Sequence, residues 1–241
     1  MLNQAFYLYL SLSLIANLLG GFILFLKKDW SVRKLSGFLS LSSGILLSIT
    51  IFELIPETIQ LSHFSSLFIC IGFLFLFLIQ KVLSKRRFYQ NEKVAVFLSS
   101  LLGIFIHSLF EGMIIFSSFL LNQYVGSLIL LGSMIHKFLD GFLVYFMTFY
   151  FYQDKKKALL SVLFLILATL FGTNIALFFS ESILLNESTI YAFALSITSG
   201  IFLYIPIVDL IPKTNLDQNH FNRLFLFIGI CIIPLLNIWF H

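Results

Sequence analysis

The amino-acid sequence predicts an all-α membrane protein whose helices cross the bilayer eight times. The first observation is composition: 59% of the 241 residues are hydrophobic and 11% are charged, whereas a soluble domain carries about a quarter charged residues. The second is that the apolar residues gather into eight long runs with short polar connections. The third is that basic residues occupy only alternate connections, as expected of a chain that passes repeatedly through a membrane.

Each run is judged against the roughly 20 mostly apolar residues that a spanning helix needs. The first run has no positively charged segment before it, so we expect a retained helix rather than a cleaved signal peptide. The third and eighth runs are the shortest. We expect a single transmembrane domain over residues 1–241, with spans at roughly 6–26, 35–56, 64–80, 94–121, 125–152, 158–180, 190–212 and 224–240.

The distribution of positive charge predicts the orientation. Fourteen of the 15 basic residues lie in connections on one side, and the fifteenth, Lys137, lies inside a run. The positive-inside rule places that side in the cytoplasm and both termini outside, which requires an even number of spans. The fourteen are Lys27, Lys28, Arg33, Lys34, Lys81, Lys85, Arg86, Arg87, Lys93, Lys155, Lys156, Lys157, Lys213 and Arg223.

Composition also argues against other functions. Because the basic residues are confined to short loops, nucleic-acid binding is not expected. Cys70 and Cys231 lie within apolar segments, which favours small buried hydrophobes over a disulfide or a thiolate site.

Two paired segments suggest an internal symmetry. The second run ends in Glu53-Leu-Ile-Pro56 and the seventh in Asp209-Leu-Ile-Pro212, and these two runs have opposite orientations. The fourth and fifth runs, also opposite, share the pattern described next. We therefore expect inverted-topology repeats, with helices 1–3 related to helices 6–8 and helix 4 to helix 5, as in many secondary transporters.

The shared pattern is a histidine followed four positions later by a carboxylate and then a glycine. It occurs as His107-Ser-Leu-Phe-Glu111-Gly112 and, 29 residues on, as His136-Lys-Phe-Leu-Asp140-Gly141. On a helix, residues i and i+4 share a face, about 6 Å apart along the axis. We interpret the four side chains as ligands of one divalent ion, zinc above all, with iron or manganese also compatible. The alternative is a set of hydrogen bonds that holds helices together.

We expect the two following glycines, Gly112 and Gly141, to let helices 4 and 5 approach closely. Lys137 is unexpected beside these ligands, since its positive charge opposes the binding of a metal cation. One interpretation is that it fills the space of a second cation. The other is an i, i+3 ion pair with Asp140 that competes with the metal.

Other charged residues in the runs suggest a transport path. An acid or lysine at the bilayer centre costs about 2.5–3.5 kcal/mol on the insertion scale, so such residues need a polar cavity, a partner or a cation. Glu53, Glu57 and His63 would collect cations near the outer face, or form an ordinary solvated helix end. Asp209 would serve the exit near the inner face, and Lys137, inside the fifth run, is also counted with this path. No spacing argument supports the further polar candidates Asn17, Asn174, Ser108 and Thr198.

These motifs resemble the ZIP (Zrt-, Irt-like) family of divalent metal transporters. The His-Ser-x-x-Glu-Gly of helix 4 and the His-Lys of helix 5 carry the likeness, and the acid-Leu-Ile-Pro segments are similar to the family's second and seventh helices. The resemblance implies zinc transport, and in some members Fe²⁺, Mn²⁺ or Cd²⁺, into the cytoplasm. It implies that His107, Glu111, His136 and Asp140 hold the ion with Ser108 adjacent.

The resemblance is mixed in one respect. The pairing of His-Ser with His-Lys is similar to a subgroup that binds one ion, with the lysine replacing the second, but that subgroup usually lacks a carboxylate at the position of Asp140. The histidine-rich loop typical after helix 3 is also missing, because residues 81–93 contain no histidine.

The sequence therefore favours a transporter rather than an enzyme, with no prosthetic group, a divalent metal ion as cargo and the bilayer as its surroundings. Two alternatives remain open: an intramembrane zinc-dependent lipid hydrolase, and a metal-free carrier of protons or an organic cation. We expect a multi-pass protein of a bacterial inner membrane, and a homodimer is left open.

Overall fold

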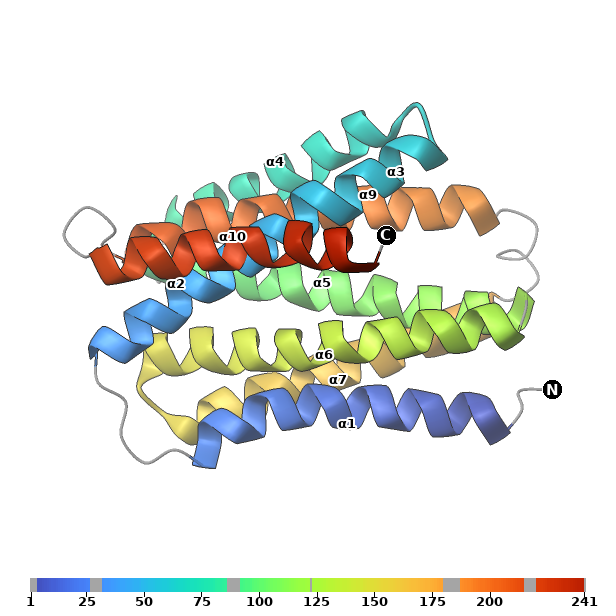
Figure 1. Cartoon of the computed structure of the whole chain (residues 1–241), viewed down its shortest axis with the longest axis horizontal. Coiled ribbons are helices and arrows are strands. Elements are labelled where there is room, and N and C mark those ends of the chain that lie inside the picture. Colours follow the sequence, from blue (N-terminus) through green and yellow to red (C-terminus); the bar gives the residue numbers. More distant parts are fainter. Residues whose placement is uncertain are drawn as a thin grey trace. The chain divides into compact units, whose positions relative to one another are not determined.

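The computed structural model describes residues 4–26, 32–85, 92–121, 123–179, 187–214 and 220–240. Over these ranges the chain is helical and contains no strand (Figure 1). The elements are α1 (Gln4–Leu26), α2 (Val32–Ile49), η1 (Thr50–Leu54), α3 (Ile55–Leu61), α4 (Ser65–Lys85), α5 (Glu92–Leu121), α6 (Gln123–Tyr152), α7 (Lys155–Phe178), α9 (Glu187–Tyr204), η2 (Ile205–Leu210), η3 (Ile211–Thr214) and α10 (His220–Phe240).

A helix occupies each of the eight predicted runs, which confirms the all-α prediction. Six are long and apolar enough to cross a membrane, judged by length and composition over the described residues: Phe6–Leu26, Ser36–Leu61, Ser65–Lys85, Lys93–Ser117, Lys155–Phe178 and Tyr191–Thr214. Many of their large apolar side chains are exposed, for example Leu78 and Phe171, as expected where lipid replaces water. The count of eight spans stays a prediction.

The second helical run was predicted to end at Pro56, and this boundary is wrong. The chain passes through a π-helical turn, η1, and continues as α3 to Leu61. Pro56 lies in the first turn of α3, where its missing N–H is tolerated best. The seventh run behaves similarly: α9 leads into the π-helix η2, which contains Asp209.

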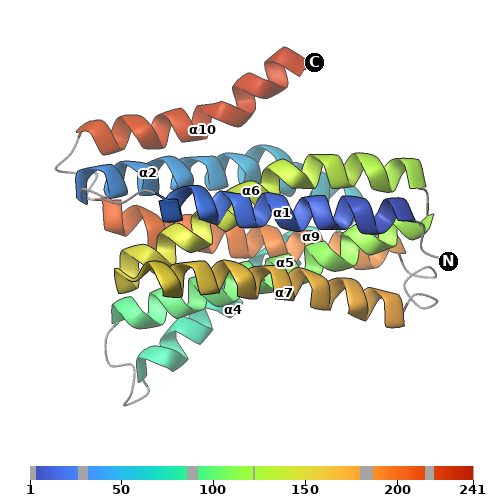
Figure 2. The same cartoon turned by 90° about the horizontal axis from the view of Figure 1, so that it is seen from below.

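The helices form two compact units, each assembled from separate stretches of sequence. The first comprises residues 1–28 and 104–191, and the second comprises residues 29–103 and 192–241. In the first unit α1 lies alongside α6 and α7 (Figures 1 and 2). Its apolar core includes Phe6, whose ring meets the rings of Phe116 and Phe119 edge-to-face at 5.9 Å and 5.3 Å between centroids.

In the second unit α10 lies alongside α2 (Figures 1 and 2). A buried polar group joins α4, α5 and α9: the Tyr204 hydroxyl donates to Gln80 Oε1 at 2.9 Å and lies 2.9 Å from Ser99 Oγ. Such hydrogen bonds fix helices to one another where no water competes.

Glycines set the closest helix contacts in both units. In the first unit a methyl group on Gly112 of α5 would overlap the carbonyl oxygen of Thr169 in α7, and one on Gly141 of α6 would overlap that of Asn17 in α1. The prediction that these two glycines bring helices 4 and 5 together is therefore wrong. Each glycine instead lets its helix pack against a different neighbour.

Candidate metal centre

The two histidine–carboxylate patterns lie in the first unit, one on α5 and one on α6. Because both helices are regular at these positions, each histidine lies one turn before its carboxylate. His107, Glu111 and Asp140 are buried, at 7%, 9% and 4% exposure, and His136 is partly buried. Burial of this degree removes the water that would otherwise solvate two carboxylates.

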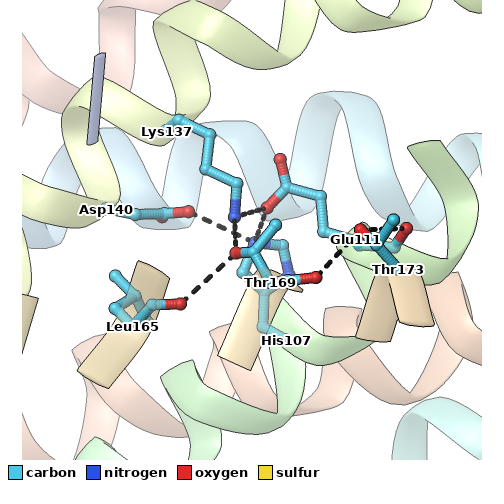
Figure 3. A network of polar contacts seen from close by, with 8 residues as sticks. His107, Glu111, Lys137, Asp140, Leu165, Thr169 and Thr173 are labelled. Carbon is cyan, nitrogen blue, oxygen red and sulfur yellow. Dashed lines mark hydrogen bonds and ion pairs between the residues drawn. The ribbon is translucent and has the colours of Figure 1, made fainter. Parts of the chain in front are cut away.

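The side chains of the two helices converge, as the sequence predicted. One ligand atom from each of His107, His136 and Asp140 can be chosen so that all three lie within 4.8 Å of one another. The imidazole rings of the two histidines are 5.3 Å apart between centroids. Figure 3 shows His107 pointing between the carboxylates of Glu111 and Asp140.

The separations are close to those of a metal site. His107 Nε2 lies 3.3 Å from Glu111 Oε2 and 3.4 Å from Asp140 Oδ2. Two ligands at 2.0–2.2 Å from one ion and at a tetrahedral angle lie roughly 3.3–3.6 Å apart. The donor set, imidazole nitrogen and carboxylate oxygen, is one that zinc accepts. Small adjustments of these side chains would therefore close them around an ion.

Lys137 makes its ion pair with Glu111, not with Asp140. Its Nζ lies 2.7 Å from Glu111 Oε2 and donates a 2.8 Å hydrogen bond to Thr169 Oγ1, and the lysine is fully buried (Figure 3). The i, i+3 pair with Asp140 is thus wrong. The reason is that the long lysine stem reaches across to the neighbouring helices α5 and α7 rather than back along α6. The ammonium occupies space at the site next to Glu111, whereas the Asp140 carboxylate faces His107.

Residues of α7 complete this arrangement, and sequence analysis missed them. The Thr173 hydroxyl donates to the carbonyl oxygens of Gly112 and Thr169, at 3.2 Å and 3.0 Å. Two threonines one turn apart, with Gly172 between them, were the available signal in an otherwise apolar run. Together they hold α7 against Gly112, the glycine that follows Glu111.

The remaining predicted residues lie as follows. Ser108 is fully buried beside His107, and its Oγ has no hydrogen-bond partner among the residues the structure describes. Of the five predicted path residues, Lys137 lies in the first unit and the other four belong to the second, so these four are not part of the histidine–carboxylate group. Glu53, Glu57 and His63 are exposed, whereas Asp209 is fully buried and pairs with Lys213.

The site combines a divalent-ion ligand set with a fixed positive charge. Two carboxylates and one ammonium lie in this buried region, and His107 lies within ion-pair distance of both carboxylates. With both imidazoles deprotonated, as a metal requires of its ligands, the protein contributes a net charge of about −1, and a buried uncompensated charge is unfavourable. A divalent cation would be attracted to it and would find nitrogen and oxygen ligands already facing one another.

Comparison with known proteins agrees with the motifs. A family model described as ZIP zinc transporter matches residues 89–237. Over 147 residues the chain is 30% identical to Protein zntC of Dictyostelium discoideum, covering 58% of this chain and 35% of that protein. Over 136 residues it is 29% identical to Zinc transporter zipt-7.2 of Caenorhabditis elegans, covering 55% of this chain and 29% of that protein.

The matched region thus spans about a third of the length of these relatives. It contains α5, α6, α7 and α9, and therefore both histidine–carboxylate patterns. Because the family model covers well over half of the sequence, the resemblance inferred from the motifs is confirmed: the chain belongs to the ZIP zinc transporter family.

Proposed function

We propose that this protein carries divalent metal ions, zinc first among them, across a membrane into the cytoplasm by alternating access. The observation that carries the proposal is the convergence of His107, His136 and Asp140 in a buried site. Zinc would be held by these three residues. Glu111 would act as a fourth ligand, with Ser108 adjacent.

The division into two units supports the proposed movement. All five of the metal-binding candidates lie in the first unit, so this unit would carry the ion while the second remains in place. The path residues Glu53, Glu57, His63 and Asp209 all lie in the second unit. There they would guide ions toward the outer and inner mouths.

Inverted repeats are also part of the proposal, and the glycine contacts support them. α2 and α10 pack closely at two glycines: a methyl group on Gly44 would overlap the Leu226 carbonyl oxygen, and one on Gly229 would overlap that of Leu41. α9 and α4 pack in the same way, because a methyl group on Gly200 would overlap the Ile69 carbonyl oxygen and one on Gly72 that of Ile197. The step from Gly44 to Gly200 is 156 positions (200 minus 44), the same as from Glu53 to Asp209 (209 minus 53). Both acids, moreover, sit in π-helices.

The orientation, with both termini outside, rests on the loop charges. Placement in a bacterial inner membrane, a homodimeric assembly and the transport of Fe²⁺, Mn²⁺ or Cd²⁺ remain predictions. We propose no prosthetic group and no enzymatic activity.

The test is metal uptake by the full-length protein in sealed proteoliposomes that enclose a zinc-sensitive dye. We expect zinc-dependent uptake that is lost in His107→Ala and in Glu111→Ala. A matched control is Ser43→Ala, a buried serine whose hydroxyl donates to the Leu39 carbonyl of its own helix. Normal uptake in both site variants would remove the site from consideration.

The same vesicles separate the alternatives. Flux without added lipid substrate favours transport over a lipid hydrolase. Zinc content of the purified protein, or stabilisation by zinc, distinguishes it from a metal-free carrier, and the lack of both would contradict our proposal.

A further inference from the structure

The metal site has two halves, and the helix pairs that form them make equivalent glycine contacts. On α5 and α7, Gly112 meets the Thr169 carbonyl and Gly172 meets the Leu109 carbonyl; on α6 and α1, Gly141 meets the Asn17 carbonyl and Gly20 meets the Phe138 carbonyl. From α5 to α6 both positions advance by 29 (141 minus 112, 138 minus 109). From α1 to α7 both advance by 152 (169 minus 17, 172 minus 20). The two helix pairs are therefore equivalent residue by residue.

This equivalence assigns a counterpart to each residue around the lysine. On one half, the Lys137 ammonium is held by Glu111 and Thr169. The same steps lead from Lys137 to Ser108, from Glu111 to Asp140 and from Thr169 to Asn17. The second half therefore has a carboxylate, Asp140, in the place of Glu111 and a polar residue, Asn17, in the place of Thr169. In the place of the Lys137 cation it has only a short serine, Ser108.

Two polar side chains of this second half lack partners. Asn17 and Ser108 are fully buried, and Asn17 Oδ1, Asn17 Nδ2 and Ser108 Oγ have no hydrogen-bond partner among the described residues. The same is true of Ser13 Oγ, one turn before Asn17 on α1 and fully buried. Asp140 is 4% exposed, and its Oδ2 lies 3.4 Å from His107 Nε2. Buried polar groups in such numbers need an explanation, and an ion is one of the few available.

The helix contacts place Asn17 against Gly141, the residue that follows Asp140. The Asn17 Oδ1 atom lies 2.7 Å from the point where a Cβ on Gly141 would be, directly after Asp140 in α6. Ser13 lies on the same face of α1 as Asn17, since four residues separate them. The oxygen atoms thus come from three helices, α1, α5 and α6.

We propose that Asp140, Asn17, Ser108 and Ser13 bind a sodium ion, and that this ion competes with the transported metal for Asp140. The inference rests on the proposed function, because it shares Asp140 with the metal site. In effect, sodium on this half corresponds to the Lys137 ammonium on the other.

Charge and ligand type favour a small monovalent ion. The ligands are oxygens only, which hard cations prefer, and they include a single carboxylate. Glu111 and Lys137 compensate each other, so with both imidazoles neutral one positive charge balances Asp140 when no divalent ion is bound. A site that is neutral in both halves would cross the membrane interior more easily than one with a net charge.

The direct test is binding of ²²Na⁺ to the purified full-length protein, without zinc, by scintillation proximity. We expect saturable binding that is lost in Asn17→Ala, in Ser13→Ala and in Asp140→Asn, and retained in Ser43→Ala. Each variant is first checked for a single symmetric peak in size exclusion. If Asn17→Ala does not fold, Ser13→Ala decides the test.

A second measurement compares zinc affinity in sodium with that in choline at equal ionic strength. For competition at one site, the apparent zinc dissociation constant rises by a factor of one plus the sodium concentration over its own dissociation constant. At ten times that constant the rise is about elevenfold. In Asn17→Ala and Ser13→Ala, zinc affinity should be the same in both salts.

The outcomes separate this inference from the proposed function. Zinc binding that is identical in sodium and choline, with no ²²Na⁺ binding, overturns the sodium site and leaves metal transport intact. Saturable ²²Na⁺ binding without any zinc binding supports the sodium site and overturns the proposed function. ²²Na⁺ binding that persists in all three site variants also overturns the assignment.

Discussion

Replacing Lys137 with methionine tests how the buried charges of the metal site are balanced. In the structure its ammonium is fully buried and lies 2.7 Å from Glu111 Oε2. Methionine keeps the apolar stem but removes the charge, so the Glu111 carboxylate loses its counterion. We expect the metal-free protein to become less stable and the effect of zinc on stability to become larger.

The magnitude follows from the burial of both partners. Removing one member of a buried ion pair costs about 3–5 kcal/mol. At about 2–4 °C per kcal/mol for a chain of this size, the metal-free melting temperature falls by roughly 6–20 °C. Zinc then meets two uncompensated carboxylates instead of one. If its affinity rises tenfold, about 1.4 kcal/mol, the zinc-induced shift exceeds that of the wild type by about 3–6 °C.

The assay is the fraction of monodisperse protein in size exclusion after heating, with and without zinc. Lys213→Met is the matched control, because Lys213 pairs with buried Asp209 in the other unit, which contains none of the proposed zinc ligands. It should lower stability without changing the shift caused by zinc. A Lys137→Met protein whose metal-free stability equals that of the wild type, or whose response to zinc shrinks, would refute this account of the charges.

Three further predictions concern packing and ligands. Gly112→Ala should lower the unfolding free energy by about 1–3 kcal/mol or more, since its methyl group meets a backbone carbonyl. Gly37→Ala, whose methyl group meets side-chain atoms of Phe221 and Asn222 and no backbone, should cost less; equal melting temperatures would contradict the packing argument. Thr169→Val should cost about 1–3 kcal/mol because Lys137 loses a buried acceptor, and Thr169→Ser should restore most of it; failure of serine to do so in thermal unfolding would show that the hydrogen bond matters little. His136→Ala should weaken zinc binding in calorimetry at least tenfold, and unchanged affinity would remove it from the ligand set.

The helices and the location of the site could be predicted because both depend on local sequence. Runs of apolar residues define helices wherever lipid is the solvent, and spacing of four residues puts His107 and Glu111 on one face whatever surrounds them. The convergence of α5 and α6 was inferred from the repeat of this pattern, since two charged faces in an apolar environment have few other ways to be satisfied.

The partners across helices could not be predicted. Lys137 was expected to pair within its own helix, but its reach depends on how α5 and α7 lie, which no spacing reveals. Gly112 and Gly141 were correctly singled out as contact points, yet each meets a helix far away in sequence. The continuation of the chain past Pro56 was missed because proline usually marks an end, whereas a π-helical turn just before it keeps the backbone helical.

The two π-helical turns have a consequence for how this sequence tolerates insertions and deletions. A π turn is an α-helix with one additional residue, so loss of a single residue from Thr50–Leu54 would restore a regular helix rather than break it. Because the wider π turn absorbs the additional residue, the side chains beyond it would keep nearly the same directions around the helix axis. Alignments of related sequences should therefore show single-residue gaps, if anywhere inside these helices, at Thr50–Leu54 and at Ile205–Leu210.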